Sequence, residues 1–327
     1  GYIRTEAGLV LIENCENEGD ITGSNSVSSS SNRPFAGGIA GRIEVTGGAS
    51  AAVQIHRCLN IGKIDSTYLG GGITAYMQRS ATCTESATEV AECRNNGNVT
   101  GLDYAGGIIG YTQNACTADT HSGVFNCLNT GEVKSDACAG GIIGRQYGFD
   151  IKNSYVSGTV QEAENSGAFV GKAEGTVYCE TDASYYLETV SARTVGLENM
   201  LCIELGANKV SAADASKAET FASLDFKNIW TMSTSGPVLS VSSEEPNPEQ
   251  TDSKPEQTSN EPVQTTSEPE STTSEMEQTA KESEQVTSES EQTNNVPEQT
   301  TDSSEQTSDE PQQTTGESDR TTDEPEQ

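Results

Sequence analysis

The sequence predicts an all-β protein, a parallel β-helix (β-solenoid) with a small capping segment and a long disordered acidic tail. Three observations support this prediction: a two-part phrase occurs five times between residues 12 and 171, one part of each repeat has constant spacing, and the composition changes abruptly after residue 240. Repeats of this length are typical of solenoids, in which each unit buries its apolar face only against its neighbours.

The first half of the phrase is Cys-x-Asn-x-Gly, followed two residues later by Ile or Val. Its complete copies are marked by Cys15, Cys58, Cys93 and Cys127 and by Asn17, Asn60, Asn95 and Asn129, and a degenerate fifth copy begins at Ser154. Strands of neighbouring coils stack about 4.8 Å apart, so equivalent residues should lie above one another. We therefore predict an inward column of thiols and a ladder of hydrogen-bonded Asn side chains. Left-handed Asn or positive-φ Gly should turn the corner there.

The second half of the phrase centres on a Gly-Gly pair followed by an apolar residue. Its copies are residues 36–41, 70–75, 105–110, 139–144 and a looser 166–171. In copies two to five the Cys position precedes the first glycine by 13 residues, whereas the return path varies from 14 to 22 residues. Such variable loops collect on one face of a solenoid, which makes that face the candidate ligand-contact surface.

Two columns of mostly β-branched residues should supply the core, because such side chains suit a pleated buried surface. One column contains Ile21, Ile64, Val99, Val133 and Val160, and the other contains Ile39, Ile73, Ile108, Ile142 and Phe169.

The repeat resembles a known family. The pattern Cys-x-Asn-x-Gly-x-Val combined with Ala-Gly-Gly-Ile-Ile-Gly, at residues 93–110 and 127–144, is similar to the GLUG-type repeats of large surface proteins from gut-dwelling bacteria. The likeness covers residues 1 to about 240. It implies a parallel β-helix for adhesion or display, extracellular on the bacterial cell surface or secreted, with an unidentified glycan or protein of a host or neighbouring cell as partner.

The chain divides into three predicted segments. Residues 1–187 form the solenoid, expected to be incomplete at its N-terminus because Gly1-Tyr2 matches Gly110-Tyr111. Residues 188–240 form the capping segment, with a short helix near 212–222 after a Ser211–Asp214 capping box. Aromatic residues around Trp230 should form a core that covers the open end of the stack.

Residues 241–327 are predicted to be a disordered Glu/Gln/Thr/Ser/Pro-rich stalk. They hold 24 acidic and 3 basic residues and no aromatic residue, so they cannot bury enough apolar surface to offset the entropy of ordering. The net charge of −32 for the whole chain argues against a nucleic-acid partner. No apolar run is long enough to span a membrane. We expect a monomeric module.

Nine cysteines allow several interpretations. The four in the repeat are best explained as small buried hydrophobes. Cys83 and Cys116 lie in successive return loops, so a disulfide between them is feasible if the loops stack. Cys138, Cys179 and Cys202 stay unassigned. The absence of a Cys-x-x-Cys pair gives a metal site no support, and we expect no cofactor.

The sequence gives little support for catalysis. The two histidines, His56 and His121, lie in unrelated loops outside any catalytic motif. The alternative is a carbohydrate-active β-helix enzyme, either a glycoside hydrolase or a polysaccharide lyase, using loop carboxylates near Asp103, Asp119 and Glu85. Because no acidic patch spans adjacent coils, we expect a non-enzymatic protein.

Overall fold

The computed structural model describes residues 1–24, 33–117, 122–175, 179–191, 193–197, 202–204 and 206–240. The described residues all belong to one compact unit. The predicted stalk, residues 241–327, lies outside the described residues.

Five parallel sheets, here named A to E, run along the stack, and each coil adds at most one strand to a sheet. Sheet A contains β1 (Tyr2–Thr5), β6 (Ala40–Val45), β11 (Thr74–Arg79), β16 (Ile109–Asn114), β21 (Ile143–Gln146), β25 (Val170–Ala173) and β28 (Val195–Leu197). Sheet B contains β2 (Leu9–Glu13), β7 (Ala52–His56), β12 (Glu89–Ala91), β17 (Gly123–Phe125), β22 (Asp150–Lys152), β26 (Cys179–Asp182) and β29 (Cys202–Glu204). Sheet C contains β3 (Glu16–Asn17), β8 (Leu59–Asn60), β13 (Arg94–Asn95), β18 (Leu128–Asn129), β23 (Tyr155–Val156), β27 (Ser184–Leu187) and β30 (Ala207–Val210).

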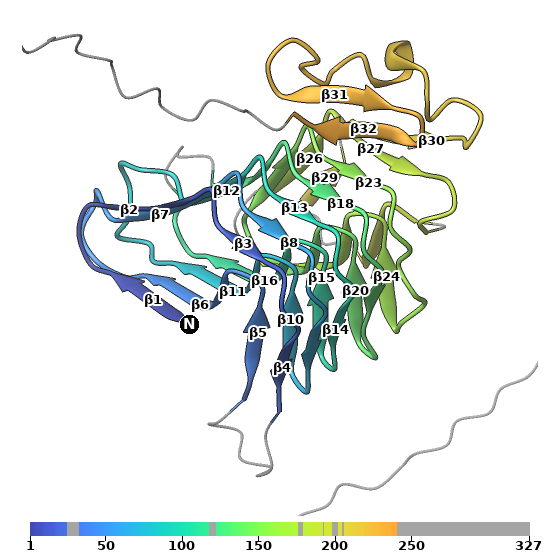
Figure 1. Cartoon of the computed structure of the whole chain (residues 1–327). Helices are drawn as coiled ribbons and strands as arrows, with labels where there is room; N and C mark the ends of the chain where they lie inside the picture. Colours follow the sequence, from blue (N-terminus) through green and yellow to red (C-terminus); the bar gives the residue numbers. More distant parts are fainter. Residues whose placement is uncertain are drawn as a thin grey trace, which may run out of the picture. The chain divides into compact units, whose positions relative to one another are not determined.

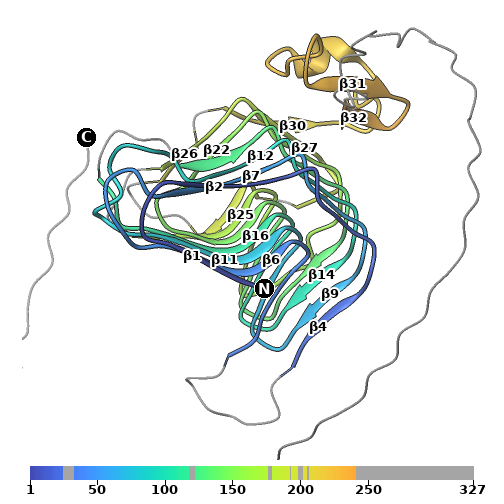
Figure 2. The same cartoon turned by 60° about the vertical axis from the view of Figure 1, so that its left-hand side comes forward.

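Sheets D and E form an arm at the side of the coil. Sheet D contains β4 (Ile21–Gly23), β9 (Ile64–Ser66), β14 (Val99–Gly101) and β19 (Val133–Lys134). Sheet E contains β5 (Phe35–Gly37), β10 (Leu69–Gly71), β15 (Tyr104–Gly106), β20 (Cys138–Gly140) and β24 (Asn165–Gly167). Equivalent strands stack in chain order along the axis (Figure 1). Sheets A and B face each other, and β4, β9 and β14 project away from them (Figure 2).

The strand register confirms the prediction that equivalent residues of successive repeats stack on one another. Asn95 pairs with Asn60 on one side and with Asn129 on the other, and Gly106 lies between Gly71 and Gly140. All these pairings are parallel, so the fold is the predicted parallel β-helix. Among the described strands, the one antiparallel sheet is the hairpin of β31 (Trp230–Ser233) and β32 (Gly236–Leu239).

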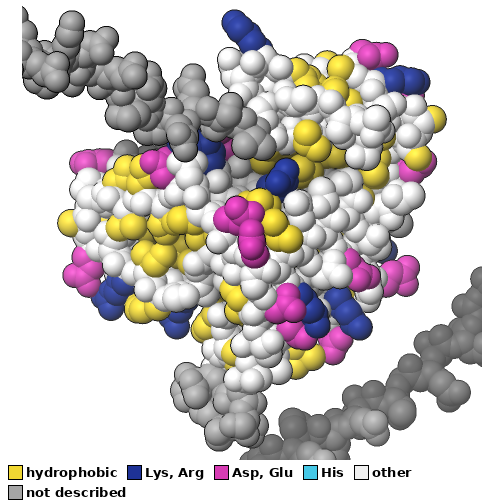
Figure 3. Space-filling view, in the orientation of Figure 1, with side chains coloured by type: hydrophobic (Ala, Val, Ile, Leu, Met, Phe, Trp, Pro, Cys, Tyr) yellow, Lys and Arg dark blue, Asp and Glu magenta, His cyan; other side chains and the backbone are white. Residues whose placement is uncertain are grey.

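The two predicted apolar columns form the core. From the second coil onward their members are buried: Ile64, Val99, Val133 and Val160 in one column and Ile73, Ile108, Ile142 and Phe169 in the other. Ile21 and Ile39 in the first coil are partly buried against the same cluster. Hydrophobic side chains also gather at the N-terminal end of the stack (Figure 3). There Tyr2, Leu9 and Leu11 are exposed.

The left-handed corner lies one residue before the Cys position, not at the predicted Asn or Gly. Six residues with φ between 49° and 55° occupy this place in successive coils: Asn14, Arg57, Glu92, Asn126, Asn153 and Ala183. The repeat glycines instead permit close approach between coils. A Cβ on Gly97 would overlap the carbonyl group of Gly62, and one on Gly72 would overlap the side chain of Asn95.

The parallel stack extends beyond the predicted boundary at residue 187. Strands β28, β29 and β30 continue sheets A, B and C as far as Val210. Ser211 Oγ accepts a hydrogen bond from the Asp214 backbone N–H at 3.2 Å, as in the predicted capping box. A turn follows, however, and the helix is a short 3₁₀ helix, η1 (Ala218–Phe221).

The aromatic residues of the C-terminal segment form the predicted core, but this core does not cover the end of the stack. Trp230 and Phe221 are buried in one cluster with outward-facing Leu128, Tyr155 and Tyr185 of sheet C. These three residues occupy equivalent positions on β18, β23 and β27. The segment therefore packs on the lateral face of sheet C, where three adjacent coils expose a continuous apolar strip.

Candidate binding surface: the aromatic corner

The Asn ladder is present and internal. Asn17, Asn60 and Asn95 each donate from Nδ2 to Oδ1 of the Asn in the next coil, at 2.7 to 2.8 Å. Each also donates to the carbonyl oxygen of the glycine two residues later. Asn60, Asn95 and Asn129 are fully buried. These amides are engaged in hydrogen bonds within the fold, so the buried ones are not accessible to a ligand.

The thiol column is also internal, and it continues as hydroxyl groups. The backbone N–H of Cys58 donates to Cys93 Sγ, that of Cys127 to Ser154 Oγ and that of Ser154 to Ser184 Oγ. Each thiol or hydroxyl group donates in turn to the carbonyl oxygen two residues earlier, closing the left-handed corner. Cys15, in the first coil, is exposed. The extension to Ser184, which has a small hydroxyl group in the thiol position, was not predicted from the sequence.

The environment of these thiols suppresses nucleophilic chemistry. Burial raises the pKa of Cys93 well above its ordinary value, and the hydrogen bond with Cys93 together with burial raises the pKa of Cys58. Because the thiolate is the reactive form, both groups are inert at neutral pH.

The predicted disulfide between Cys83 and Cys116 is wrong, since both are buried free thiols. The reason lies in the register: Arg79 pairs with Asn114, so Cys83 lies four residues beyond the paired position and Cys116 only two. Cys83 Sγ contacts the Val45 carbonyl oxygen of the preceding coil at 3.6 Å. Cys179 is disulfide-bonded, and its backbone pairs with that of Cys202.

The carboxylates of the enzyme alternative do not converge. Asp103 lies between β14 and β15 and is 3.8 Å from the guanidinium of Arg33. Glu85 lies in the loop between β11 and β12, at a different corner of the coil. Asp119 lies outside the described residues. Within the described ranges there is also no group of three His, Cys, Asp or Glu residues that could hold a metal ion.

A cluster of aromatic and arginine side chains fills the outer corner where sheet E meets sheet A. We call this surface the aromatic corner. The chain has 6 Phe, 10 Tyr and 1 Trp, and six of these lie here over four coils: Tyr2, Phe35, Tyr68, Tyr76, Tyr104 and Tyr111. Ring centroids of neighbours are 5.4 to 6.4 Å apart. Such concentration in a chain with 5% aromatic residues marks a specialised surface.

Three guanidinium groups pack over these rings. Arg42 lies 5.3 Å from the centre of Phe35 and 5.4 Å from that of Tyr76. Arg145 lies 5.0 Å from Tyr104 and 4.8 Å from Tyr111, and its Nη1 donates to Tyr104 Oη at 2.7 Å. Arg33 lies 4.5 Å from the centre of Tyr68. The rings and guanidinium groups thus hold each other in place.

Ion pairs balance the charge of the corner. Arg42 pairs with Glu44, and Arg145 pairs with Glu174, which also contacts Lys172 at 2.9 Å. Burial alone would raise the pKa of Glu174, but the hydrogen bonds from Lys172 and Arg145 outweigh it and lower the pKa. Burial raises the pKa values of Tyr104 and Tyr111, so their hydroxyl groups stay protonated at neutral pH.

The corner is accessible as well as ordered. Phe35, Tyr68, Tyr104 and Tyr111 are half-buried, and a cavity of about 340 Å³ lies at the N-terminal end, lined by Gly1, Tyr2, Phe35, Gly41 and Arg42. This surface was not predicted from the sequence. Aligning the repeats on the Gly-Gly pair would have revealed it, because Phe35 and Tyr104 precede the first glycine by two residues, while Tyr76 and Tyr111 follow it by five.

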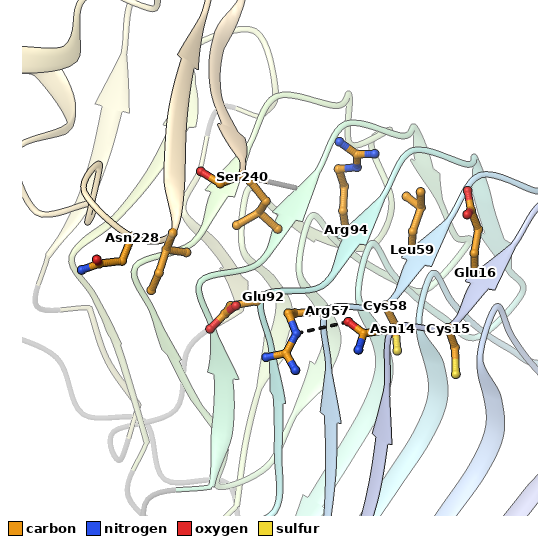
Figure 4. Close-up of a pocket in the computed structure, with 12 residues that line it drawn as sticks. Asn14, Cys15, Glu16, Arg57, Cys58, Leu59, Glu92, Arg94, Asn228 and Ser240 are labelled. Carbon is orange, nitrogen blue, oxygen red and sulfur yellow. Dashed lines mark hydrogen bonds between the residues drawn. The ribbon is translucent and has the colours of Figure 1, made fainter. Parts of the chain in front are cut away.

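A second hollow, of about 270 Å³, separates sheet C from the C-terminal segment (Figure 4). Leu59 and Arg94 line it from sheet C, and Ile229 and Leu239 line it from the opposite side. It begins where the C-terminal segment stops covering the outward side chains of sheet C. Arg57, at its rim, donates to Asn14 Oδ1 at 3.2 Å.

Comparison with known proteins identifies the repeat. The family model for the GLUG motif matches residues 135–161, the coil that contains β20 to β23. The chain carries a GLUG motif. No curated protein matches the chain. A crystal structure described as a "putative immunoglobulin A1 protease" from Bacteroides ovatus aligns at 15% identity with a TM-score of 0.38, covering 70% of this chain and 74% of that chain. Among the described residues, no helix is long and apolar enough to cross a membrane.

Proposed function

We propose that this GLUG-motif β-helix is a non-catalytic adhesion or display module, extracellular on a bacterial cell surface or secreted, with the aromatic corner as its main contact surface. The observation that carries the proposal is the corner itself. It is a half-exposed aromatic surface that crosses four coils and is held rigid by cation–π contacts and ion pairs. Rigid aromatic surfaces favour binding because little side-chain entropy is lost on contact.

The remaining features fit display. Buried Asn ladders and in-register strands make a stiff scaffold, so residues on successive coils keep fixed spacing. The acidic, aromatic-free composition of residues 241–327 suits a solvated spacer that holds the scaffold away from its attachment point. The variable loops between sheets A and B, predicted from the sequence as the ligand-contact face, are a second candidate contact region.

Attachment of coated beads tests the proposal. Fluorescent beads carrying the full chain, fixed through its C-terminus, would be applied to mucus-producing epithelial monolayers and to layers of gut bacteria. We expect retention above that of bare beads, reduced at least severalfold by the double substitution Tyr104→Ala/Tyr111→Ala. Phe125→Ala is the matched control, because Phe125 is a half-exposed aromatic residue on sheet B, away from the corner. Absence of retention on both surfaces, or equal retention of the corner variant, would overturn the proposal.

A further inference from the structure

We infer that the aromatic corner binds an uncharged, extended polysaccharide, with its sugar rings lying along the stack axis. This inference rests on the proposed function and specifies the ligand class. Four features of the corner support it: its axial repeat, its unpaired polar group, its charge balance and the state of its strand edges.

The axial repeat of the corner matches a linear sugar polymer. Phe35, Tyr68 and Tyr104 are half-buried rings contributed by three successive coils, with neighbouring centroids 5.8 and 6.4 Å apart. Each step along the axis is about 4.8 Å, close to the advance of one pyranose ring in an extended glycan. Successive sugar rings could therefore meet one half-buried aromatic ring on each successive coil. The C–H faces of sugar rings pack against aromatic rings, whereas a compact ligand would use only one step.

Polar groups suited to sugar hydroxyl groups flank the rings. Tyr76 Oη donates to Gln113 Oε1 at 2.7 Å, which fixes this half-buried amide, and the side-chain amide of Gln78 lies 3.2 Å from Tyr76 Oη. Within the described part of the chain, the Nε2 group of Gln113 has no hydrogen-bond partner. It is a pre-oriented donor, and Gln78 pairs in register with Gln113 on the neighbouring coil. A purely apolar ligand would leave the Gln113 donor unsatisfied.

The charge balance selects an uncharged polymer. Arg42, Arg145 and Arg33 face Glu44, Glu174 and Asp103, respectively. Each guanidinium group already has a carboxylate within 4.0 Å, which weakens its attraction for an acidic sugar. Such a sugar would also approach a chain with a net charge of −32.

The strand edges argue against a peptide ligand. From β6 to β21, each strand of sheet A is paired on both sides, as are β10, β15 and β20 of sheet E. An extended peptide therefore could not add as a strand along the corner and would lose the main-chain hydrogen bonds that usually supply affinity. A glycan requires no such bonds.

Affinity electrophoresis and calorimetry with the full chain test the inference. The uncharged probes are mixed-linkage β-glucan, xylan, galactomannan and starch, and the charged probes are polygalacturonate and hyaluronan. We expect at least one uncharged polymer to bind, and Tyr111→Ala to weaken its binding at least tenfold, which equals about 1.4 kcal/mol. Gln113→Ala, which removes a half-exposed amide outside the core, should also weaken binding, whereas Phe125→Ala should leave it within twofold. Urea unfolding of each variant verifies the fold.

The outcomes separate the two proposals. Attachment of beads without binding of any uncharged polymer, or stronger binding of the charged polymers, would overturn the ligand class and leave the adhesion proposal standing. Equal affinity of the wild type, Tyr111→Ala and Gln113→Ala proteins would overturn the assignment to the corner. Release of reducing ends or unsaturated products from a bound polymer would overturn the non-catalytic function.

Discussion

Single residues of the Asn ladder should differ in their contribution according to their place in the stack. Asn95 receives a hydrogen bond from Asn60 and donates to both Asn129 and Gly97, all in a fully buried site. Asn17 is half-buried and lies in the first coil. Asn95→Ala should therefore lower the free energy of unfolding by about 1–3 kcal/mol, and Asn17→Ala by less. Urea unfolding with unchanged m-values checks this, and equal midpoints would contradict it.

The thiols provide a second prediction at this scale. Cys15 is the exposed one among the seven free thiols in the described part of the chain, while burial and the neighbouring Cys58 raise its pKa. In the native protein we expect iodoacetamide to label Cys15 first. Labelling should be slow at pH 7 and faster as the pH rises toward the raised pKa, because only the thiolate reacts. Peptide mass spectrometry locates the label, and a urea-unfolded sample is the positive control. Native labelling of Cys93 at a similar rate would contradict the buried column.

At the scale of the element, the glycine before each sheet D strand controls how closely coils approach. Gly19 and Gly97 hold the same position in the repeat, but a Cβ on Gly97 would overlap the Gly62 carbonyl group, whereas Gly19 has no atom within 4 Å of a Cβ. Gly97→Ala should destabilise by about 1–3 kcal/mol through overpacking. Gly19→Ala should be neutral or slightly stabilising, because it reduces the entropy of the unfolded chain. Similar thermal midpoints for the two variants would refute this role for close approach.

The sheets themselves could be predicted because their signal repeats. Cys, Asn, Gly and β-branched residues recur at fixed spacing, and the register of the strands follows that spacing. The left-handed corner could not be predicted, since only three of its six residues are Asn and the other three, Arg57, Glu92 and Ala183, share no side-chain chemistry. Backbone hydrogen bonds around the following Cys or Ser impose the conformation there. The wrong prediction of a disulfide between Cys83 and Cys116 has a similar origin. Loop lengths do not reveal that the two cysteines are offset by two residues in the stacked loops.

The candidate surface and the C-terminal segment depend on contacts that repeat spacing does not encode. Tyr68 and Tyr104 meet only because sheets D and E fold into an arm, which brings corner residues of adjacent coils within 6.4 Å. Leu128, Tyr155 and Tyr185 attract the C-terminal segment because they align on three coils, although each alone is an unremarkable outward residue. The sequence patterns therefore predicted the β-helix scaffold but neither the aromatic corner nor the apolar strip on sheet C.

For the whole molecule, the uneven distribution of charge predicts that residues 241–327 affect the Stokes radius of the protein and leave the stability of its folded part unchanged. Residues 241–327 carry 24 acidic and 3 basic residues, which leaves a net charge of −11 on residues 1–240. A chain ending at Ser240 should unfold at the same urea midpoint as the full chain, because the removed composition offers no aromatic and little apolar surface to bury. Its Stokes radius should fall by much more than its mass implies. Raising the salt concentration should shrink the full chain by screening self-repulsion and leave the shorter chain unchanged. A lower urea midpoint for the shorter chain, or a salt-insensitive radius for the full chain, would show that the acidic segment packs on the β-helix and does not act as a spacer.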